Sequence, residues 1–324
     1  MKKTRIQAAV IGVGYLGNFH TEKYTKLPNV ELVGVVDANP LRAKEIAAKY
    51  HTNAFHSVDD ILDRVDAVSI AVPTDQHYEV ARKCLEQGID VLIEKPITHK
   101  LWQAEALIDL AKERKCILQV GHLERFNPAI EKMKSSLTHP LFIECHRLHS
   151  FVQRGTEVDV VLDLMIHDLD IILDLVQSPV ASLDAAGVNV MSDLIDIANV
   201  RLKFESGCVA NVTASRISMK PMRKIRFFQE DCYVSCDFQT AQVEIYRQVK
   251  KQNEKLPEIT AETLSLEKKD ALEEEIKSFL QAVQTRSRPR VSGEDALRAL
   301  RLAQSIVDQI HVTVPGRTQP EVRA

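Results

Sequence analysis

The feature that most constrains this chain is a glycine-rich turn that interrupts an apolar run near its start. Residues 6–20 read IQAAVIGVGYLGNFH, in which Gly12, Gly14 and Gly17 have the spacing G-x-G-x-x-G. An almost continuously apolar run predicts a buried parallel strand, with a helix behind the turn. The first glycine permits the bend, the second lets a pyrophosphate approach the backbone, and the third lets the helix pack on the strand. The residues expected to bind a dinucleotide here are Gly12, Gly14, Tyr15, Leu16 and Gly17.

A second apolar stretch supports this interpretation. Residues 30–37 read VELVGVVD, a strand pattern that ends in Asp37 about twenty residues after the turn. An acid at that place holds the adenosine ribose hydroxyls, and its charge repels a 2′-phosphate. Ala38 and Asn39 offer no positive charge there, whereas Arg42 is close enough in sequence to reach the adenine. We therefore predict NAD rather than NADP; a glycine loop without a nucleotide is the weaker alternative.

Composition limits the class of protein. The chain has 324 residues, of which 45% are apolar and 27% charged, as expected for a globular protein of two domains. Its net charge of -3 gives no electrostatic reason to expect nucleic acid or an anionic membrane as a partner. No segment is long enough to span a bilayer, and the first apolar run is too short for a signal peptide. The six scattered cysteines form no C-x-x-C pair, so we expect reduced thiols and a cytoplasmic protein.

The pattern of predicted elements changes once along the chain. Up to residue 121, strands alternate with helices, which predicts a doubly wound parallel sheet. After Gly121 come a helix over 128–137, a strand over 141–148 and a helical segment over 158–176. Consecutive strands between residues 195 and 247 and two closing helices at 272–285 and 293–311 follow. Strands without intervening helices predict an open, mostly antiparallel sheet. The expected fold class is α/β for residues 1–121, followed by an α+β domain over residues 122–324.

Polar residues occupy the carboxyl ends of the predicted strands, where doubly wound sheets bind ligands. These residues are Asp37, Thr74, His77, Glu94, Lys95 and His122, and all of them except His122 are expected to bind the cofactor. Lys95 is the most informative, because it follows an apolar strand and precedes Pro96, which biases its backbone away from helix. Its ammonium group would polarise a carbonyl or stabilise an alkoxide next to a nicotinamide. The alternative for Lys95 is a solvated lysine in a turn. Judged alone, His77 and His20 are interpreted as packing or helix-surface residues.

A second group lies in residues 158–176, VDVVLDLMIHDLDIILDLV. On a helix the spacing places one set of polar residues on one face, namely Asp159, Asp163, His167, Asp170 and Asp174. An Asp four residues before a His can orient the imidazole and raise its basicity, as a general base requires. The alternative is the solvated stripe of an amphipathic helix, which we favour for Asp159 and Asp174. No third ligand is indicated, so we predict no metal site.

At these residues the chain resembles a known family. It is similar over essentially its whole length to the glucose–fructose oxidoreductase/inositol dehydrogenase/MocA-like (Gfo/Idh/MocA) oxidoreductases. The matching features are AVIGVGYLGNFH, Asp37, AVPTDQH, the Glu94-Lys95-Pro96 triplet and DLMIHDLD. The resemblance implies a Rossmann domain followed by a domain whose open sheet commonly forms the oligomer interface, and hence a homodimer or homotetramer. It also implies that Lys95, Asp163 and His167 line the site where hydride is exchanged with C4 of the nicotinamide.

This chain differs from the family pattern at some positions and resembles one branch of the family most. Where many members have glycines, this chain has Glu157, Val158 and Met165, so the shape of the pocket is not carried over. The segments GHLERFNP and TASRISMKPMRKIRFF look most like the branch that acts on UDP-N-acetylglucosamine at C3. We therefore expect an NAD-dependent oxidoreductase that acts on the C3 hydroxyl of a UDP-N-acetylhexosamine. The alternatives are an inositol, polyol or free-sugar dehydrogenase and a non-catalytic NAD-bound sensor, against which the intact Lys95, Asp163 and His167 argue.

Basic residues give this substrate class a possible anchor. Five of them fall within eleven residues, namely Arg216, Lys220, Arg223, Lys224 and Arg226, and Arg125, Arg147 and Arg154 lie on segments expected to border the same cleft. On a strand, Arg223 faces away from Lys224 and Arg226, so only some of these residues address one site. A solvated or interface-facing basic strand is the alternative. The predicted substrate residues are Lys95, His122, Arg125, His167 and Arg216, with His167 as general base, Asp163 as its orienting partner and Lys95 as donor to the reacting oxygen.

Overall fold

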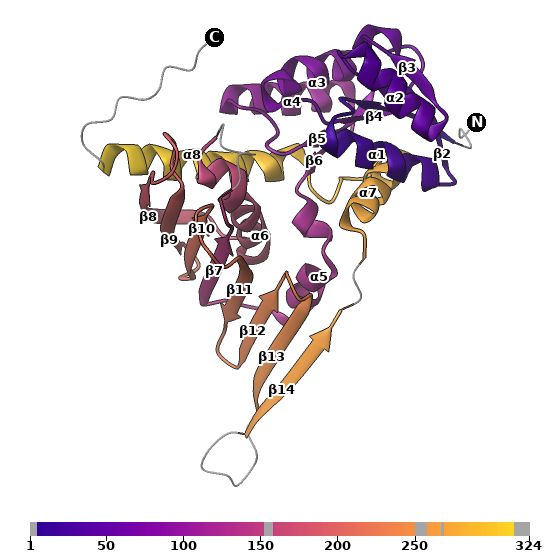
Figure 1. Ribbon diagram of the computed structural model, residues 1–324. Coiled ribbons are helices and arrows are strands. Elements are labelled where there is room, and N and C mark those ends of the chain that lie inside the picture. The colour runs from indigo at the N-terminus through magenta and orange to yellow at the C-terminus, as the bar shows by residue number, and fades with distance from the viewer. Residues whose placement is uncertain (1–4, 152–157, 250–257, 267–268, 314–324) are drawn as a thin grey trace. The chain divides into compact units, whose positions relative to one another are not determined.

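The chain divides into two compact units. A computed structural model describes residues 5–151, 158–249, 258–266 and 269–313 (Figure 1). Unit 1 comprises residues 1–126 and 270–297, and unit 2 comprises residues 127–269 and 298–324. Unit 1 first ends at residue 126, whereas the sequence predicts a domain boundary at residue 121. Residues 270–297 also belong to unit 1, so a single boundary in the sequence cannot separate the two units.

Unit 1 is built on a six-stranded parallel sheet with the strand order β3-β2-β1-β4-β5-β6. The order reverses between β1 and β4, so the switch point of this doubly wound sheet adjoins the glycine turn. The strands are β1 (Ile6–Ile11), β2 (Val30–Val36), β3 (Asn53–Phe55), β4 (Ala67–Ile70), β5 (Asp90–Glu94) and β6 (Leu118–Gly121). The helices are α1 (Tyr15–Lys26), α2 (Pro40–Tyr50), α3 (His77–Glu86), α4 (Leu101–Arg114) and α7 (Ala271–Thr285), with 3-10 turns η1 (Val58–Asp60), η2 (Thr74–Gln76) and η3 (Leu123–Phe126).

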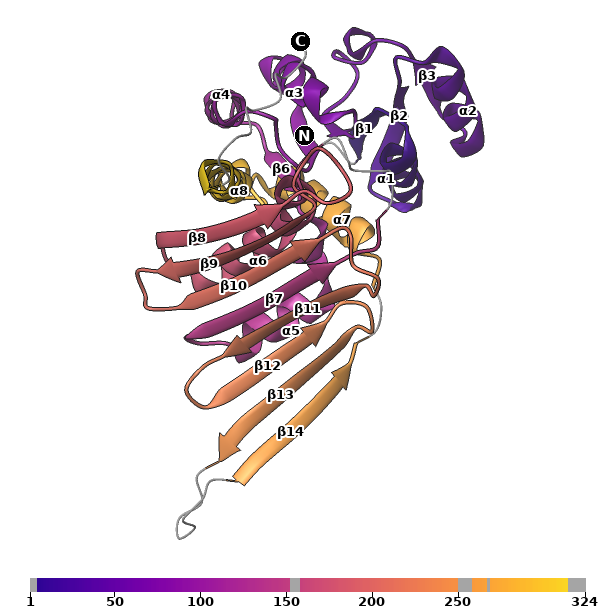
Figure 2. The same cartoon turned by 60° about the vertical axis from the view of Figure 1, so that its left-hand side comes forward.

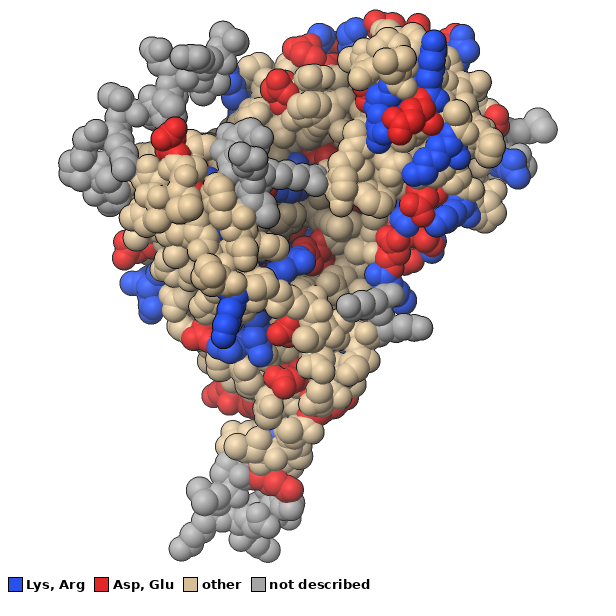
Figure 3. Space-filling model, viewed as in Figure 1, with Lys and Arg blue, Asp and Glu red and all other residues tan. Residues whose placement is uncertain are grey.

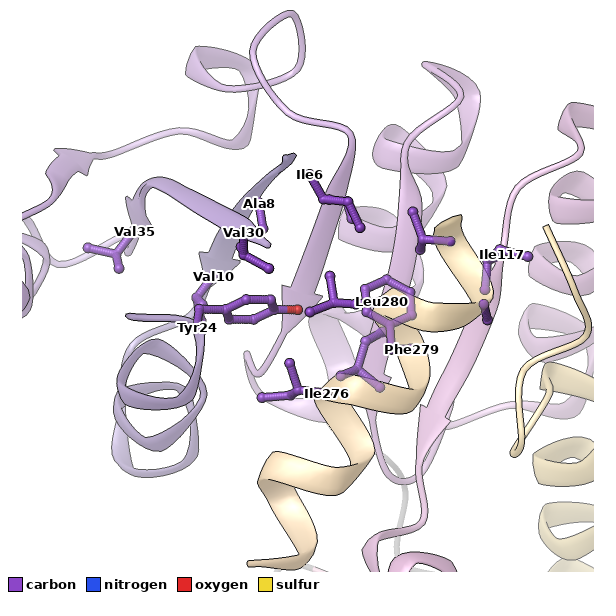
Figure 4. Close-up of a cluster of buried hydrophobic side chains, with 14 of the residues drawn as sticks. Ile6, Ala8, Val10, Tyr24, Val30, Val35, Ile117, Ile276, Phe279 and Leu280 are labelled. Carbon is purple, nitrogen blue, oxygen red and sulfur yellow. The ribbon is translucent and has the colours of Figure 1, made fainter. Parts of the chain in front are cut away.

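One core of unit 1 lies between the sheet and three helices. Apolar side chains of α1, α2 and α7 pack on the same face of the strands, and α7 contributes Ile276, Phe279 and Leu280 (Figure 4). These residues recur three and four positions apart, which gives α7 the apolar stripe of a packed helix. Tyr24 of α1 is 1% exposed, and its hydroxyl group lies 2.9 Å from that of Ser69. Burial of this stripe explains why α7 returns to unit 1.

Unit 2 is built on an eight-stranded sheet with the order β14-β13-β12-β11-β7-β10-β9-β8. All neighbours are antiparallel except β7 and β10, so the sheet is mostly antiparallel as expected. The strands are β7 (Phe142–Leu148), β8 (Val180–Val188), β9 (Ile197–Phe204), β10 (Val209–Ser215), β11 (Met222–Phe228), β12 (Cys232–Asp237), β13 (Gln242–Val249) and β14 (Glu258–Ser265). The helices are α5 (Pro128–Ser136), the π-helical turn η4 (Val161–Met165), α6 (Ile166–Val176) and α8 (Gly293–Thr313), whose first five residues belong to unit 1.

The sheet of unit 2 has one covered and one open face. Figure 2 shows α5 and α6 behind the strands, while the face turned toward the viewer carries no helix. Strand β9 illustrates the difference, since Ala198, Val200 and Leu202 are buried whereas Asn199 and Arg201 are exposed. On the face shown in Figure 3, basic and acidic side chains are interspersed among the described residues. Along the described ranges no helix is both long enough and apolar enough to cross a membrane, and all six cysteines are free.

Some elements depart from the sequence-based expectation. Strands β3 and β14 were not expected, because β3 has only three residues and β14 is almost wholly exposed and lacks an apolar alternation. The single helix expected over 158–176 is wrong in its first part, where the chain forms the π-helical turn η4 before α6 begins at Ile166. A pattern of polar residues every three or four positions is compatible with either helix type, so the sequence could not reveal the wider turn.

Candidate cofactor and catalytic residues

The three glycines of the turn each answer a different steric demand. Gly12 has φ +81°, and a Cβ atom there would lie 2.7 Å from the backbone nitrogen of Val72. A Cβ atom on Gly17 would lie 1.8 Å from the carbonyl oxygen of Gly12, so α1 packs on the turn only with glycine at this place. Around Gly14 no atom lies within 4 Å of such a Cβ. The turn therefore forms an open cradle at the N-terminus of α1, which fits a pyrophosphate.

Asp37 follows β2 directly and lies against this turn. Its Oδ2 accepts a hydrogen bond of 2.9 Å from the backbone of Val13, and its Oδ1 accepts one of 2.9 Å from Asn39. Arg42 braces the same turn, because its Nε donates to the carbonyl oxygen of Val13 at 2.8 Å. Arg42 also pairs with Glu45 at 2.9 Å. The structure thus gives Arg42 a role in holding the turn, which the sequence did not indicate.

The ends of β4 and β5 are joined by His77. Its Nδ1 lies 2.9 Å from the carbonyl oxygen of Pro96, and its Nε2 lies 3.0 Å from that of Val72. The ring is 1% exposed, and burial lowers the pKa of His77. Its nitrogens are therefore directed at the backbone, and we assign His77 the role of positioning the two strand ends. Thr74 is half-buried at the start of η2, between these ends.

Glu94 and Lys95 close β5 at the same edge of the sheet. The Oε1 atom of Glu94 lies 2.9 Å from Nε2 of His20, and its Oε2 accepts the backbone N–H of Lys95 at 3.3 Å. Burial alone would raise the pKa of Glu94, but the hydrogen bond and charge of His20 lower it. The side chain of Lys95 is half-buried, and the Lys95–Pro96 peptide bond is cis. His20, which the sequence placed among packing residues, thus holds the carboxylate beside Lys95.

Two further predicted residues follow β6 and are almost fully buried. His122 is 1% exposed and Arg125 is 5% exposed. The backbone N–H of Arg125 donates to the carbonyl oxygen of His122 at 3.0 Å, which closes the 3-10 turn η3. Unit 1 therefore brings His122 to the carboxyl edge of the sheet next to the end of β5, where Gly121 pairs with Glu94. Arg125 lies one turn further along.

In unit 2, Asp163 and His167 lie where the π-helical turn passes into α6. Asp163 is in η4 and donates its backbone N–H to the carbonyl oxygen of Asp159 at 3.0 Å. His167 is in the first turn of α6, and both side chains are half-buried. Single π-helical turns inside helices occur often at functional sites, because the wider turn re-aims a side chain. This local irregularity supports Asp163 and His167 as functional residues.

The outer acids of the same segment are structural, not solvated. Asp159 is 9% exposed, and its Oδ1 accepts the backbone N–H of Ile195 at 2.9 Å. Asp174 accepts hydrogen bonds from Lys134 at 3.0 and 3.2 Å. The expectation that these two acids form a solvated stripe is therefore wrong, because each side chain ties the segment to another part of unit 2.

Two buried ion pairs involve predicted arginines. The guanidinium group of Arg147 bonds both carboxylate oxygens of Asp168, at 2.7 and 2.9 Å. That of Arg216 donates to Asp196 at 2.9 Å and to the carbonyl oxygens of Val158 and Ile195 at 2.9 and 3.1 Å. Arg216 is 4% exposed. Its donors serve the protein, so the structure does not support the prediction that Arg216 binds substrate; the buried partner Asp196 could not be recognised from the sequence.

Of the other basic residues near Arg216, Arg223 lies on the helix-covered face of the sheet. It is directly opposite Arg147 on β7, whereas Lys224 and Arg226 point to the open face, where Arg226 pairs with Glu144 at 3.1 Å. Arg223 is half-buried, and burial lowers its pKa. Arg154 and Glu157 lie outside the described residues. In the part of the chain that the structure describes, no group of three His, Cys, Asp or Glu side chains could hold a metal ion.

Family models match most of the chain in two adjacent segments. Residues 6–122 match an oxidoreductase family with an NAD-binding Rossmann fold, and residues 130–237 match the C-terminal domain of the Gfo/Idh/MocA proteins. The chain belongs to this family. It is therefore an oxidoreductase built on an NAD-binding Rossmann fold, as the turn, Asp37 and the Glu94-Lys95-Pro96 triplet indicated. The expected fold class and family resemblance are confirmed.

Individual relatives narrow the comparison. The chain is 40% identical over 279 residues to UDP-N-acetylglucosamine 3-dehydrogenase of Acidithiobacillus ferrooxidans, covering 86% of this chain and 88% of that enzyme. A solved structure of that enzyme matches with a TM-score of 0.90 at 38% identity, covering 96% of this chain and 99% of the other. Scyllo-inositol 2-dehydrogenase of Bacillus subtilis is 28% identical over 66% of this chain and 68% of its own length. The predicted branch thus has the stronger of these similarities.

Proposed function

We propose that this protein oxidises the C3 hydroxyl of a UDP-N-acetylhexosamine with NAD as hydride acceptor. The observation that carries this proposal is the 40% identity, over most of both chains, to a UDP-N-acetylglucosamine 3-dehydrogenase. The open cradle at Gly14 and the carboxylate of Asp37 support a dinucleotide in unit 1. Free cysteines favour the reducing cytoplasm as the compartment.

The roles of the residues follow from their chemistry. When bound, NAD supplies C4 of its nicotinamide as the acceptor of hydride. His167 takes the hydroxyl proton as general base, because an alcohol gives up hydride readily only as its proton leaves. Asp163 orients His167, and the ammonium group of Lys95 donates a hydrogen bond to the reacting oxygen. Thr74, His77 and Glu94 shape the carboxyl edge of the sheet in unit 1, and His122 and Arg125 contribute to substrate binding.

The proposed activity is tested by NAD reduction against a panel of substrates. The panel holds UDP-N-acetylglucosamine, UDP-N-acetylgalactosamine, UDP-glucose, myo-inositol and scyllo-inositol, with NADH measured by absorbance. The enzyme concentration is comparable to that of the substrate, so that reduction of NAD retained by the protein is also detected. Each reaction is run with and without 2-oxoglutarate as hydride acceptor. Reduction with UDP-N-acetylhexosamines alone is the expected result. Turnover of inositols without nucleotide sugars would replace this function with the polyol activity that the 28% identical relative suggests, and NAD binding without any reduction would favour the sensor.

Arg223 is the basic residue that we propose for the diphosphate. It lies on the face of the sheet that α6 covers, and charge-assisted guanidinium–phosphate contacts are strong and often bidentate. We expect Arg223→Gln to weaken UDP by about 10-fold or more without changing the affinity for NAD. Arg226→Gln, on the open face, is the matched control. Calorimetric titration of UDP into each NAD-loaded variant measures its affinity for UDP. Equal affinities in Arg223→Gln and Arg226→Gln would show that Arg223 does not bind the substrate.

We infer that NAD is preferred over NADP because of Asp37. The nearby Arg42 has its Nε bonded to the carbonyl oxygen of Val13 and pairs with Glu45, so it offers a 2′-phosphate little compensation. Asp37→Ala is expected to weaken NAD about 10-fold and to bring the dissociation constants for NAD and NADP closer together. Fluorescence titration with both reduced cofactors measures the ratio. Equal affinities for NAD and NADP in the unchanged protein would overturn this preference.

We also propose that the open face of the unit 2 sheet pairs with a second copy of the chain in a homodimer or homotetramer. Four aromatic rings run side by side across its strands, and their centroids are separated by 5.9, 4.8 and 5.3 Å. The rings belong to Phe142, Phe228, Tyr233 and Tyr246. All four side chains are half-buried, and aromatic residues are enriched in the cores of protein interfaces. Tyr233→Lys should then lower the mass measured by light scattering, and a monomer in the unchanged protein would contradict the proposal.

A further inference from the structure

A buried acid in unit 1 is left without a hydrogen-bond partner. Glu275 of α7 is 1% exposed, and neither of its carboxyl oxygens has a partner among the described residues. The side-chain amide of the neighbouring Gln119 donates to the backbone carbonyl of Glu275 at 3.1 Å, and its Oε1 also lacks a partner. Buried polar groups are almost always hydrogen-bonded, so a carboxyl group in this state requires an explanation.

Besides burial, the charge that raises the pKa of Glu275 is that of another acid, Glu94, at the end of β5. The elements that pack on α7 include α1, β5, β6 and η3. Their titratable or charged groups include His20, Lys23 and Tyr24 of α1, Glu94 and the adjoining Lys95 of β5, and Glu124 and Arg125 of η3. Lys23 pairs with Asp270, the N-cap residue of α7. His20 is bonded to Glu94, and Tyr24 to Ser69. No Lys, Arg or His of the described ranges forms an ion pair with Glu275.

The two acids therefore differ in charge. Burial raises the pKa of Glu275 well above its ordinary value, and the negative charge of Glu94 raises it further. The hydrogen bond from His20 and that from the Lys95 backbone keep Glu94 ionised despite its burial. These opposite shifts favour the state in which Glu275 holds a proton and Glu94 carries the negative charge. Like charges close together in a site of low dielectric constant make a second ionisation unfavourable.

The position of this pair relates it to the cofactor. The glycine turn and Asp37 take the adenosine half of a dinucleotide at β1 and β2, so the nicotinamide half extends over the ends of β4 and β5 on the other side of the switch point. Glu94 is the last residue of β5. An oxidised nicotinamide carries a positive charge and a reduced one does not. A positive charge at the end of β5 offsets the repulsion between two carboxylates and so favours the second ionisation.

We propose that Glu94 and Glu275 form a proton site linked to the charge of the cofactor. The proposal rests on the NAD-dependent function proposed above. On binding of NAD⁺, the O–H bond of Glu275 breaks, its electron pair stays on the carboxylate, and the proton passes to the buffer. NADH brings no positive charge and leaves Glu275 protonated. The affinity for NAD⁺ therefore rises with pH more steeply than the affinity for NADH.

The experiment compares proton release in the unchanged protein and in Glu275→Gln. Calorimetric titrations with NAD⁺ and with NADH are run in two buffers of different ionisation enthalpy, at several values between about pH 6 and pH 9, so that the buffer dependence counts the protons released. We expect release of up to about one proton with NAD⁺, less with NADH, and no NAD⁺-specific release in Glu275→Gln. Glu274→Gln is the matched control, because Glu274 precedes Glu275 on α7 and pairs with Lys277. It should behave like the unchanged protein.

Each outcome decides the proposal. Equal NAD⁺-specific release in the unchanged protein and Glu275→Gln, or no such release at any pH, overturns it. If Glu275→Gln does not fold, Glu94→Gln replaces it. Removal of the charge that opposes ionisation should then move the NAD⁺-linked release to lower pH, and an unmoved release profile would overturn the proposal. Absence of NAD binding would count against the proposed cofactor, whereas NAD binding without sugar oxidation leaves this test intact.

Discussion

We expect His167→Ala to lower kcat by about 10²- to 10⁴-fold and to leave the affinity for NAD almost unchanged. The size of the effect follows from general base catalysis, because the alanine variant has no group to take the hydroxyl proton as hydride leaves. The affinity for NAD should persist because the glycine turn and Asp37, which are expected to bind it, belong to unit 1, whereas His167 belongs to unit 2. Steady-state rates and fluorescence titration of NADH measure the two quantities separately.

The matched control for this variant is His139→Ala. His139 is an exposed histidine of the same unit, in the connection between α5 and β7, so its loss should leave kcat near that of the unchanged protein. A near-normal kcat in His167→Ala would remove His167 as the base and make Lys95 the candidate. A large fall in NAD affinity would instead show that the substitution disturbs more than proton transfer.

The order of strands and helices in unit 1 could be predicted because the sequence signals that mark them are local. An apolar run, glycines at fixed spacing and an acid after the second strand all occur within about forty residues, and the structure shows the steric reason for Gly12 and Gly17. The same holds for α2, which begins at Pro40 after the capping side chain of Asn39. Strand β14 had no such signal, since it is an exposed edge strand with a charged and polar sequence.

The candidate site was only partly predictable, because burial and pairing depend on distant segments. Arg216 lies among basic residues in the sequence, yet its guanidinium group is held by Asp196, twenty residues earlier. His20 meets Glu94 across 74 residues. Glu275 did leave a signal: it lies on the stripe defined by Leu272, Ile276 and Phe279, where a charged residue is out of place. A single acid on an apolar helix face therefore merits attention even when the charges beside it are ordinary.

Above neutral pH we expect the free energy of unfolding of Glu275→Gln to be larger than that of the unchanged protein, although the variant lacks a native side chain. In the unfolded chain Glu275 ionises near its ordinary pKa, whereas burial and the charge of Glu94 keep it protonated in the folded state. As pH rises from the unfolded value toward the raised folded value, the unfolded state loses a proton that the folded state keeps. The free energy of unfolding then falls by about 1.4 kcal/mol per pH unit from this group alone. Glutamine does not ionise, so the free energy of unfolding of Glu275→Gln does not fall with pH in this way.

The measurable quantity is the difference in unfolding free energy between Glu275→Gln and the unchanged protein, from urea titrations at several pH values. Other titrating groups contribute equally to both proteins, so the difference should widen by about 1.4 kcal/mol for each pH unit between the unfolded pKa and the raised folded pKa. Glu274→Gln, a substitution of a half-buried acid that pairs with Lys277 on the same helix, should show no such slope. A constant difference would mean that Glu275 is ionised in the folded protein. Because proton release on NAD⁺ binding requires a proton on Glu275 beforehand, that result would also remove the linked proton site, by a measurement that uses no cofactor.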